Sequence, residues 1–144
     1  MNTESRSIKN ILLVEDDMRD VELTLAALEE HHLANKVEVF HDGAEALDYL
    51  YHRGKFKTRA PGNPVVLLLD NKMSKVSGLE VLKIIKADEH LKLIPVVVLT
   101  SSRETPELLE FYKHGVNAYV VKPVGFSEFM KAVQQLGHFL GGIQ

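Results

Sequence analysis

Short apolar runs recur along this 144-residue chain, and the segments between them space their apolar residues differently. Four runs occupy residues 10–14, 65–70, 95–99 and 117–121, while residues 37–41 alternate apolar with polar side chains. Short runs of this kind, bounded by turn-forming residues, are typical of strands. The pattern therefore predicts five strands, of which the second along the chain is half-exposed.

The segments after the strands carry apolar residues three and four positions apart, as the buried face of a helix does. Asp17 is suited to cap the first helix, and Asp20 carries a charge that the helix dipole favours. Pro106 suits an early helical position because its missing N–H is not needed there. The predicted helices cover residues 18–32, 43–51, 79–85, 106–115 and 126–140.

Five strand–helix units of this length predict an α/β fold, a doubly wound parallel sheet with helices on both faces. A strand order of 2-1-3-4-5 would bring Asp16 to Asp70. The acidic strand ends are consistent with this order but do not prove it. We expect a single domain over residues 1–144, with a flexible tail at residues 1–8 and no output domain.

Composition narrows the classes of function. The formal net charge of −3 provides no general attraction to nucleic acid or to an anionic membrane surface. No apolar run has the length of a membrane span, and the polar N-terminus lacks the apolar core of a signal peptide. The chain has no cysteine, which excludes disulfides and thiol catalysis. We therefore expect a cytoplasmic protein that binds neither nucleic acid nor membranes.

Polar residues stand where four of the predicted strands end: Glu15, Asp16 and Asp17, then Asp70, then Thr100, then Lys122. In open α/β sheets this edge binds ligands. Clustered carboxylates repel one another unless a cation lies among them, and Mg²⁺ accepts carboxylate, water and phosphate oxygens. A carboxylate beside such a cation can attack phosphorus and form an acyl phosphate. These residues predict magnesium-assisted phosphorylation of Asp70.

Each of these residues has a plainer interpretation when taken alone. Asp70 and Thr100 could cap helices, Lys122 could be solvated, and Tyr119 could be a half-buried packing residue. The Lys122–Pro123 bond is expected to be trans, the usual isomer. The basic loop at residues 53–59, which contains Arg53, Lys55, Lys57 and Arg59, is expected to be solvated.

Four motifs taken together resemble the receiver domain of response regulators in bacterial two-component signalling. They are LLVEDD at 12–17, LLD at 68–70, VLTSS at 98–102 and AYVVKP at 118–123, and their spacing covers nearly the whole chain. The resemblance implies a flavodoxin-like (βα)5 fold. It also implies a histidine kinase whose phosphohistidine donates the phosphoryl group to Asp70.

The resemblance further implies a magnesium site. In that family the positions of Glu15, Asp16 and Asp70 serve this site, together with the backbone carbonyl at the position of Lys72. One departure from the family pattern is Ser74, where proline is usual. Serine frees a backbone N–H and is expected to loosen this turn.

The remaining roles concern the response to phosphorylation. By resemblance, Thr100 and Lys122 contact the phosphoryl group, and Tyr119 moves inward together with Thr100 as a switch. The expected output is a changed surface of the fourth helix, fifth strand and fifth helix, through which related proteins also form homodimers. Such a domain is not an enzyme in the usual sense, although it catalyses its own phosphorylation and dephosphorylation.

The resemblance narrows to the stand-alone regulators of bacterial phytochrome kinases. It rests on the basic loop at 54–63, on TSSRE at 100–104 and on KPVGFSEF at 122–129. This subgroup implies a phytochrome-type histidine kinase as the partner.

Four other functions can be weighed against this one. A haloacid-dehalogenase-type phosphatase needs a second aspartate two residues after the nucleophile, and Lys72 stands there. A flavodoxin-like flavin module needs a phosphate-binding loop after the first strand, where acidic residues would repel phosphate. The alternatives left open are a non-phosphorylated scaffold and a phosphate sink in a phosphorelay.

Overall fold

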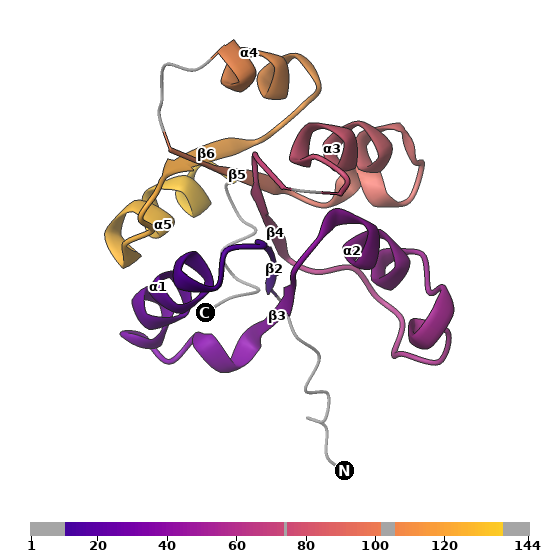
Figure 1. Cartoon of the computed structure of the whole chain (residues 1–144), viewed down its shortest axis with the longest axis horizontal. Helices are drawn as coiled ribbons and strands as arrows, with labels where there is room; N and C mark the ends of the chain where they lie inside the picture. Colours follow the sequence, from indigo (N-terminus) through magenta and orange to yellow (C-terminus); the bar gives the residue numbers. More distant parts are fainter. Residues whose placement is uncertain (1–10, 74, 102–105, 137–144) are drawn as a thin grey trace.

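The structure, a computed structural model, describes residues 11–73, 75–101 and 106–136. Strands and helices alternate through these residues as the apolar pattern predicts (Figure 1). The strands are β2 (Ile11–Val14), β3 (Val37–Phe40), β4 (Val66–Asp70), β5 (Val96–Thr100) and β6 (Ala118–Val121). The helices are α1 (Met18–Glu29), α2 (Gly43–Leu50), α3 (Gly78–Ala87), α4 (Pro106–Lys113) and α5 (Phe126–Gln134), with 3₁₀ turns η1 (Ala34–Lys36), η2 (Gly54–Phe56) and η3 (Leu91–Leu93).

A five-stranded parallel sheet forms the centre of the molecule, in the order β3-β2-β4-β5-β6. This confirms the predicted fold class and the strand order 2-1-3-4-5. The register pairs Val14 with Leu69 and Thr100 with Val121. Because the pairing is parallel, the C-terminal ends of the strands lie at one edge of the sheet.

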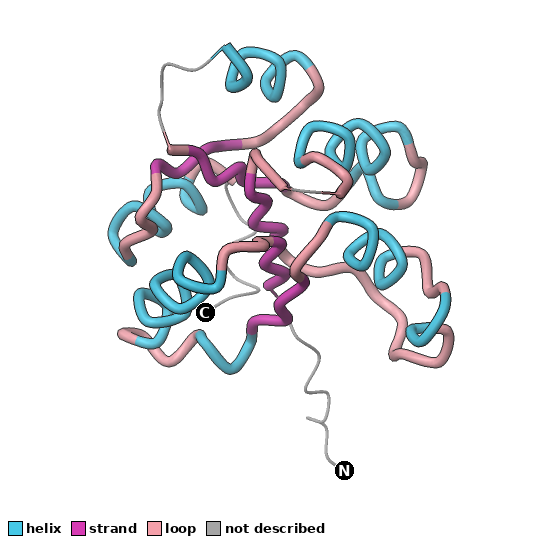
Figure 2. Tube along the Cα trace, viewed as in Figure 1, coloured by secondary structure: helices cyan, strands magenta, loops and turns pink. Residues whose placement is uncertain are grey.

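Helices cover both faces of the sheet (Figures 1 and 2). Helices α1 and α5 pack on one face, and α2, α3 and α4 pack on the other. Within β2, Ile11 and Leu13 enter the first core while Leu12 and Val14 enter the second, as the alternation of a strand requires. Every residue of β2, β4 and β5 is buried, which explains why these runs are almost entirely apolar.

Side-chain caps set where α1 and α3 begin. Asp17 caps α1 as predicted, because its Oδ1 accepts the N–H groups of Arg19 at 2.8 Å and Asp20 at 3.3 Å. Ser77 and Glu80 form a reciprocal capping box at α3. Helix α1 begins four residues after the end of β2, and the first residue of α3 abuts the backbone oxygen of Asp70 at the end of β4, so the first turns of both helices lie beside the strand ends.

Helix α1 ends at Glu29, three residues earlier than predicted. His32 has a left-handed φ of 60°, and the N–H of Leu33 donates to the carbonyl of Leu28 at 3.0 Å. Together with the bond from the His32 N–H to Glu29, this is a Schellman ending in which histidine takes the place that glycine usually occupies. The prediction extended the helix because Leu33 continues the helical spacing of apolar residues. Leu33 does pack into the core, but it does so from beyond the end of the helix.

Several expectations lie wholly or partly outside the described residues. The predicted tail at 1–8 and Ser74 are among them, and so are residues 137–140 of the last predicted helix. Within the described residues this helix ends at Gln134, with Gln135 as its C-cap, earlier than predicted. Within the described ranges, no helix is long and apolar enough to cross a membrane.

The expectation that the basic loop is solvated is wrong for Arg59. Its guanidinium carbon lies 4.0 Å from the centre of the Tyr49 ring, and its Nε donates to the Tyr49 carbonyl at 2.6 Å. The Nη1 atom donates to the Ala60 carbonyl at 2.7 Å. Tyr49 in turn packs against Phe40 and Phe56, with ring centroids 5.0 and 5.3 Å away. Arg59 therefore ties the loop to the aromatic residues beside α2.

Replacing Arg59 with lysine is expected to lower the free energy of unfolding by about 1 kcal/mol. Lysine keeps the charge but loses the planar stack on Tyr49 and the paired carbonyl contacts. The buried Nη2, which lacks a hydrogen-bond partner among the described residues, makes the net loss smaller than those contacts suggest. Urea unfolding measures the change. Arg53→Lys is the matched control. Arg53 also lies over a tyrosine ring, 4.8 Å from the centre of Tyr51, but it is exposed and its Nε pairs with Asp48 instead of a backbone carbonyl. An equal loss of stability in both variants would contradict the proposed role of Arg59.

Candidate functional site

Four strand ends meet at the C-terminal edge of the sheet, and backbone hydrogen bonds fix their positions. The N–H of Glu15 donates to the Phe40 carbonyl at 2.9 Å. The N–H of Lys122 donates to the Thr100 carbonyl at 2.8 Å, which extends the β5–β6 pairing by one residue. The polar residues that follow β2 and β6 are therefore held in strand register rather than on free loops.

Three carboxylates cluster at this edge. Ligand oxygens of Glu15, Asp16 and Asp70 all lie within 4.8 Å of one another. Glu15 and Asp70 are buried, with 0% and 2% of their surface exposed, whereas Asp16 is exposed. The cluster therefore has two buried carboxylates and one exposed carboxylate, that of Asp16. These oxygen donors fit a hard divalent cation such as Mg²⁺ or Mn²⁺.

Lys122 brings a positive charge into the same site. Its Nζ lies 2.9 Å from Asp70 Oδ1, 3.0 Å from Asp20 Oδ2 and 3.5 Å from Glu15 Oε1. The side chain is only 17% exposed, so it is not the solvated lysine of the plainer interpretation. The structure thus joins Asp70 and Lys122, which are 52 residues apart in the sequence, by a direct charged hydrogen bond.

The pKa values reflect crowding of negative charge. Burial, followed by the Asp70 charge, raises the pKa of Glu15 to about 8, against the lowering effect of Lys122. Burial also raises the pKa of Asp70, although hydrogen bonding to Lys122 opposes this shift. For Lys122, burial alone would lower the pKa, but the hydrogen bonds to Asp70 and Asp20 outweigh it and raise the pKa. The single positive charge of Lys122 does not neutralise the carboxylates around it. A bound proton or a further cation is needed to balance their negative charge.

The loop after β4 lies against the Asp70 carboxylate. The backbone of Lys72 lies close enough to lower the pKa of the Asp70 carboxyl group, so the residue predicted to supply a carbonyl ligand is adjacent to the cluster. Gly78, the first residue of α3, approaches so closely that a Cβ there would collide with the Asp70 backbone oxygen. The position of Asp70 therefore depends on a glycine eight residues later.

Thr100 and Tyr119 occupy different parts of this region. Thr100 is the last residue of β5 and is 1% exposed, which places it at the same sheet edge as Asp70. Tyr119 lies on β6, is half-buried and meets Tyr112 of α4 edge to face, with centroids 6.4 Å apart. The Lys122–Pro123 bond is cis, so the expectation of a trans bond is wrong. Sequence alone could not reveal this, because the isomer is selected by the packed turn.

Sequence reasoning missed one member of the site, Asp20. The sequence indicates only that its charge suits the helix dipole, yet its carboxylate contacts Lys122 at 3.0 Å. The position of Asp20 in the sequence could have indicated this contact. Asp20 falls in the first turn of a helix that starts at the C-terminal sheet edge, and such a turn can point a side chain at the strand ends.

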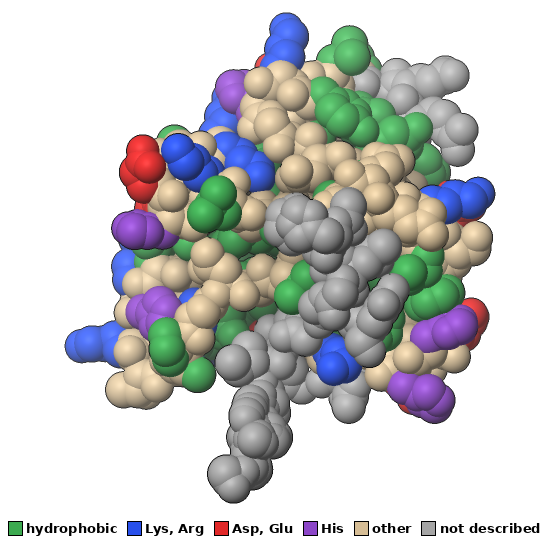
Figure 3. Space-filling view, turned by 180° about the vertical axis from the view of Figure 1, so that it is seen from behind, with side chains coloured by type: hydrophobic (Ala, Val, Ile, Leu, Met, Phe, Trp, Pro, Cys, Tyr) green, Lys and Arg blue, Asp and Glu red, His purple; other side chains and the backbone are tan. Residues whose placement is uncertain are grey.

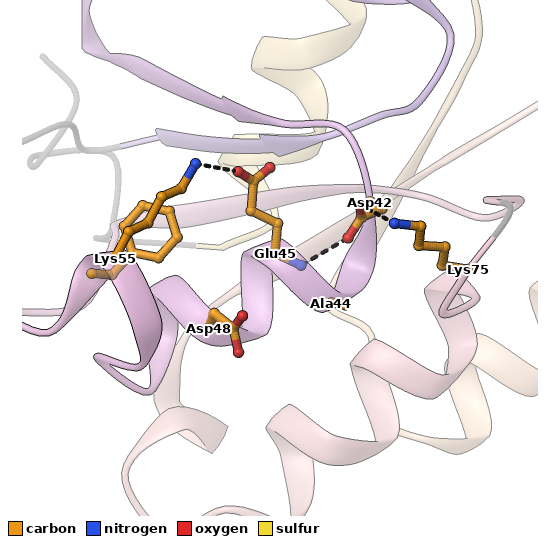
Figure 4. Close-up of a pocket in the computed structure, with 7 residues that line it drawn as sticks. Asp42, Ala44, Glu45, Asp48, Lys55 and Lys75 are labelled. Atoms are coloured by element: carbon orange, nitrogen blue, oxygen red, sulfur yellow. Dashed lines mark hydrogen bonds and ion pairs between the residues drawn. The ribbon is translucent and has the colours of Figure 1, made fainter.

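A hollow of about 500 Å³ lies beside α2, and its charges are arranged differently from those at the Asp70 edge of the sheet (Figure 4). Each of its acids has its own basic partner. Glu45 pairs with Lys55 at 3.1 Å and Asp42 with Lys75 at 3.7 Å. Asp48 pairs with Arg53, which lies outside the lining, at 3.2 Å. The unbalanced acidic charge is at the Asp70 edge and not in this hollow.

Comparisons of the sequence and of the structure with known proteins point to the same protein family. A sequence profile described as the response regulator receiver domain matches residues 11–134. The bacteriophytochrome response regulator AtBRR is 58% identical, and its structure matches with a TM-score of 0.83 over 90% of this chain and 93% of that one.

Two cyanobacterial regulators are also similar. Response regulator Rcp1 of Synechocystis sp. is 34% identical over 96% of this chain and 93% of its own length. The Mn²⁺-bound form of Rcp1 matches with a TM-score of 0.71 over 90% of this chain and 92% of that one. The phosphorylated phytochrome response regulator RcpA is 36% identical, with a TM-score of 0.74 over 92% and 93% of the two chains. From its profile match, its sheet order and these relatives, the chain belongs to the response regulator receiver domain family.

Proposed function

We propose that this chain accepts a phosphoryl group onto Asp70 from the phosphohistidine of a histidine kinase, in a magnesium-dependent reaction. The observation that carries the proposal is the 2.9 Å contact between Lys122 Nζ and Asp70 Oδ1, beside the acidic pair Glu15 and Asp16. A buried carboxylate nucleophile, acids for a cation and a fixed ammonium suit phosphoryl transfer. The phosphorylated form of the relative RcpA supports the same chemistry.

Glu15, Asp16 and Asp70 would hold the cation, with the backbone carbonyl of Lys72 as a further ligand. The donors are all oxygens, as Mg²⁺ requires, and the Mn²⁺-bound form of Rcp1 supports a divalent cation at this kind of site. When bound, such a cation supplies neutralising charge to the phosphoryl oxygens.

The transfer exchanges one bond for another. An Oδ atom of Asp70 forms a bond to phosphorus while the phosphorus–nitrogen bond of the donor histidine breaks. The histidine nitrogen keeps the electron pair of that bond. Lys122 and the Thr100 hydroxyl would receive the phosphoryl oxygens, because both lie at the strand ends beside Asp70. The product is an acyl phosphate on Asp70.

Incubation with Mg²⁺ and acetyl phosphate is expected to add the mass of one phosphoryl group, and hydroxylamine is expected to remove it. Asp70→Asn should abolish the adduct, because an amide is a poor nucleophile at this position. Intact-protein mass spectrometry measures both results. Asp48→Asn is the matched control and should be phosphorylated normally, because Asp48 lies on the surface of α2, paired with Arg53. An adduct that persists in Asp70→Asn would assign the acceptor elsewhere.

The output of this reaction is proposed to be the surface formed by α4, β6 and α5. Leu109 and Tyr112 of α4 are 67% and 44% exposed, and hydrophobic side chains gather at the end of the molecule where α4 lies (Figure 3). Phosphorylation would draw Thr100 toward the phosphoryl group and alter the packing of Tyr119 against α4. A phytochrome-type histidine kinase is the proposed partner, in line with the phytochrome response regulators among the relatives. The exposed apolar side chains of α4 are proposed as the surface for a homodimer.

Two alternatives give different results in the same experiment. A non-phosphorylated scaffold would show no adduct with acetyl phosphate or with the kinase. A phosphate sink would form the adduct but return the phosphoryl group to the kinase or lose it to water without a change in oligomeric state. Size-exclusion chromatography of the phosphorylated protein separates the sink from the signalling regulator.

A further inference from the structure

Asp20 contacts Lys122 but has none of the roles assigned above. Its Oδ2 lies 3.0 Å from Lys122 Nζ, almost as close as Asp70 Oδ1 at 2.9 Å. Both side chains are largely shielded from solvent, with 24% of the Asp20 side chain exposed. By distance, Asp20 is as strong a partner of the ammonium as the proposed phosphoacceptor is.

The hydrogen bonds at the start of α1 leave the Asp20 side chain available for the contact with Lys122. In a capping box, the side chain of the third helical residue bonds back to the N–H of the cap. Here that N–H belongs to Asp17, and it donates to Glu15 Oε2 at 3.3 Å. The N–H of Asp20 is held by Asp17 Oδ1 at 3.3 Å. The backbone of Asp20 is therefore fixed by the cap, and its carboxylate reaches Lys122 instead of the helix end.

We propose that Asp20 is a positioning residue that holds the Lys122 ammonium at the sheet edge while Asp70 becomes phosphorylated. This inference rests on the proposed function. Asp70 and Glu15, the other partners of the ammonium among the described residues, are also proposed cation ligands. Once Asp70 carries the phosphoryl group as a mixed anhydride, its linking oxygen is uncharged, and Glu15 would be occupied as a ligand of the cation. Asp20 is left as an anchor that neither the cation nor the phosphoryl group occupies.

The physical need for such an anchor lies in the lysine side chain. Lysine carries its charge on a flexible four-carbon stem, and ordering it costs roughly 1.5–2 kcal/mol of side-chain entropy. An anchor on α1, a helix fixed by its own cap, limits this freedom before and after transfer. The ammonium can then turn one N–H from Asp70 to a phosphoryl oxygen without losing its position.

Asp20→Ala is expected to slow phosphorylation by acetyl phosphate by about tenfold at saturating Mg²⁺, because one charged hydrogen bond to Lys122 is lost. Asp20→Asn keeps an acceptor oxygen without the charge and should fall between the wild type and alanine. Glu22→Ala, an exposed acid on the same helix, is the matched control and should react at the wild-type rate. Equal rates for Asp20→Ala and the wild type would overturn the proposal.

A double-mutant cycle tests whether Asp20 acts through Lys122. In the Lys122→Ala background, Asp20→Ala is expected to cause no further loss of rate. A purely structural role of Asp20 would instead lower the rate by the same factor in both backgrounds, and that result would overturn the proposal.

Nitrogen-15 NMR of the Lys122 ammonium gives a readout that needs no phosphorylation. In the unphosphorylated wild type the anchored ammonium is expected to exchange slowly enough to be seen, and in Asp20→Ala its signal should shift or broaden. Glu22→Ala should leave it unchanged. If the wild type accepts no phosphoryl group, the proposed function fails while this signal still tests the anchor. An unchanged Lys122 signal in folded Asp20→Ala or Asp20→Asn would overturn the inference.

Discussion

Gly78→Ala is expected to lower the free energy of unfolding by about 3 kcal/mol, which corresponds to a fall in Tm of about 10 °C. The added Cβ would collide with the backbone oxygen of Asp70 and lie 3.1 Å from the Asn71 Cα. Both neighbours are backbone atoms, which cannot turn away as a flexible side chain can. The end of β4 or the start of α3 must therefore move, and the Asp70 carboxylate would shift relative to Lys122.

Thermal unfolding measures this loss, and Gly125→Ala is the matched control. Gly125 precedes α5, has an ordinary φ of −104°, and a Cβ there meets no atom within 4 Å. We expect this variant to lose only about 0.5 kcal/mol, from the cap preference for glycine over alanine. Similar stabilities of the two alanine variants would show that the close approach to Asp70 is not a constraint.

In the presence of a chelator, the protein is expected to lose stability as the pH rises from about 5 to 8, by an amount on the order of a few kcal/mol. The pKa of Glu15 rises from an ordinary 4.5 to about 8 in the folded state, mainly through burial. Folded Glu15 thus holds a proton that the unfolded chain has released. Its contribution is complete below pH 4.5 and is lost as the pH reaches about 8. The raised pKa of Asp70 acts in the same direction.

Urea midpoints at several pH values measure this slope. Glu15→Gln should flatten most of it, because the amide imitates the protonated acid at every pH. Adding Mg²⁺ at pH 8 should restore stability to the wild type, since a ligand that binds the folded state stabilises it. Stability that increases between pH 5 and 8 without divalent cations would contradict the assignment of Glu15 as a buried, protonated acid.

The amino-acid pattern predicts the strands and helices of this protein and the polar residues that stand where the strands end. The apolar runs ending at Asp70 and Val14 identify strands because a buried parallel strand excludes polar side chains from both faces. The cap at Asp17 follows from local hydrogen bonding within a few residues. Asp16, Asp70 and Lys122 could be assigned to one edge because the C-terminal ends of parallel strands share it.

Which of these groups touch one another depends on the folded arrangement of the whole chain. The approach of Gly78 to Asp70, the anchoring of Lys122 by Asp20 and the cis bond before Pro123 each depend on segments from different parts of the chain. Arg59 is likewise only half-exposed because its guanidinium stacks on Tyr49, which packs against Phe40 and Phe56. Hydrophobic periodicity reports which face of an element is buried, but not which neighbour lies against it. These contacts are set by packing over long sequence separations, and no local pattern records them.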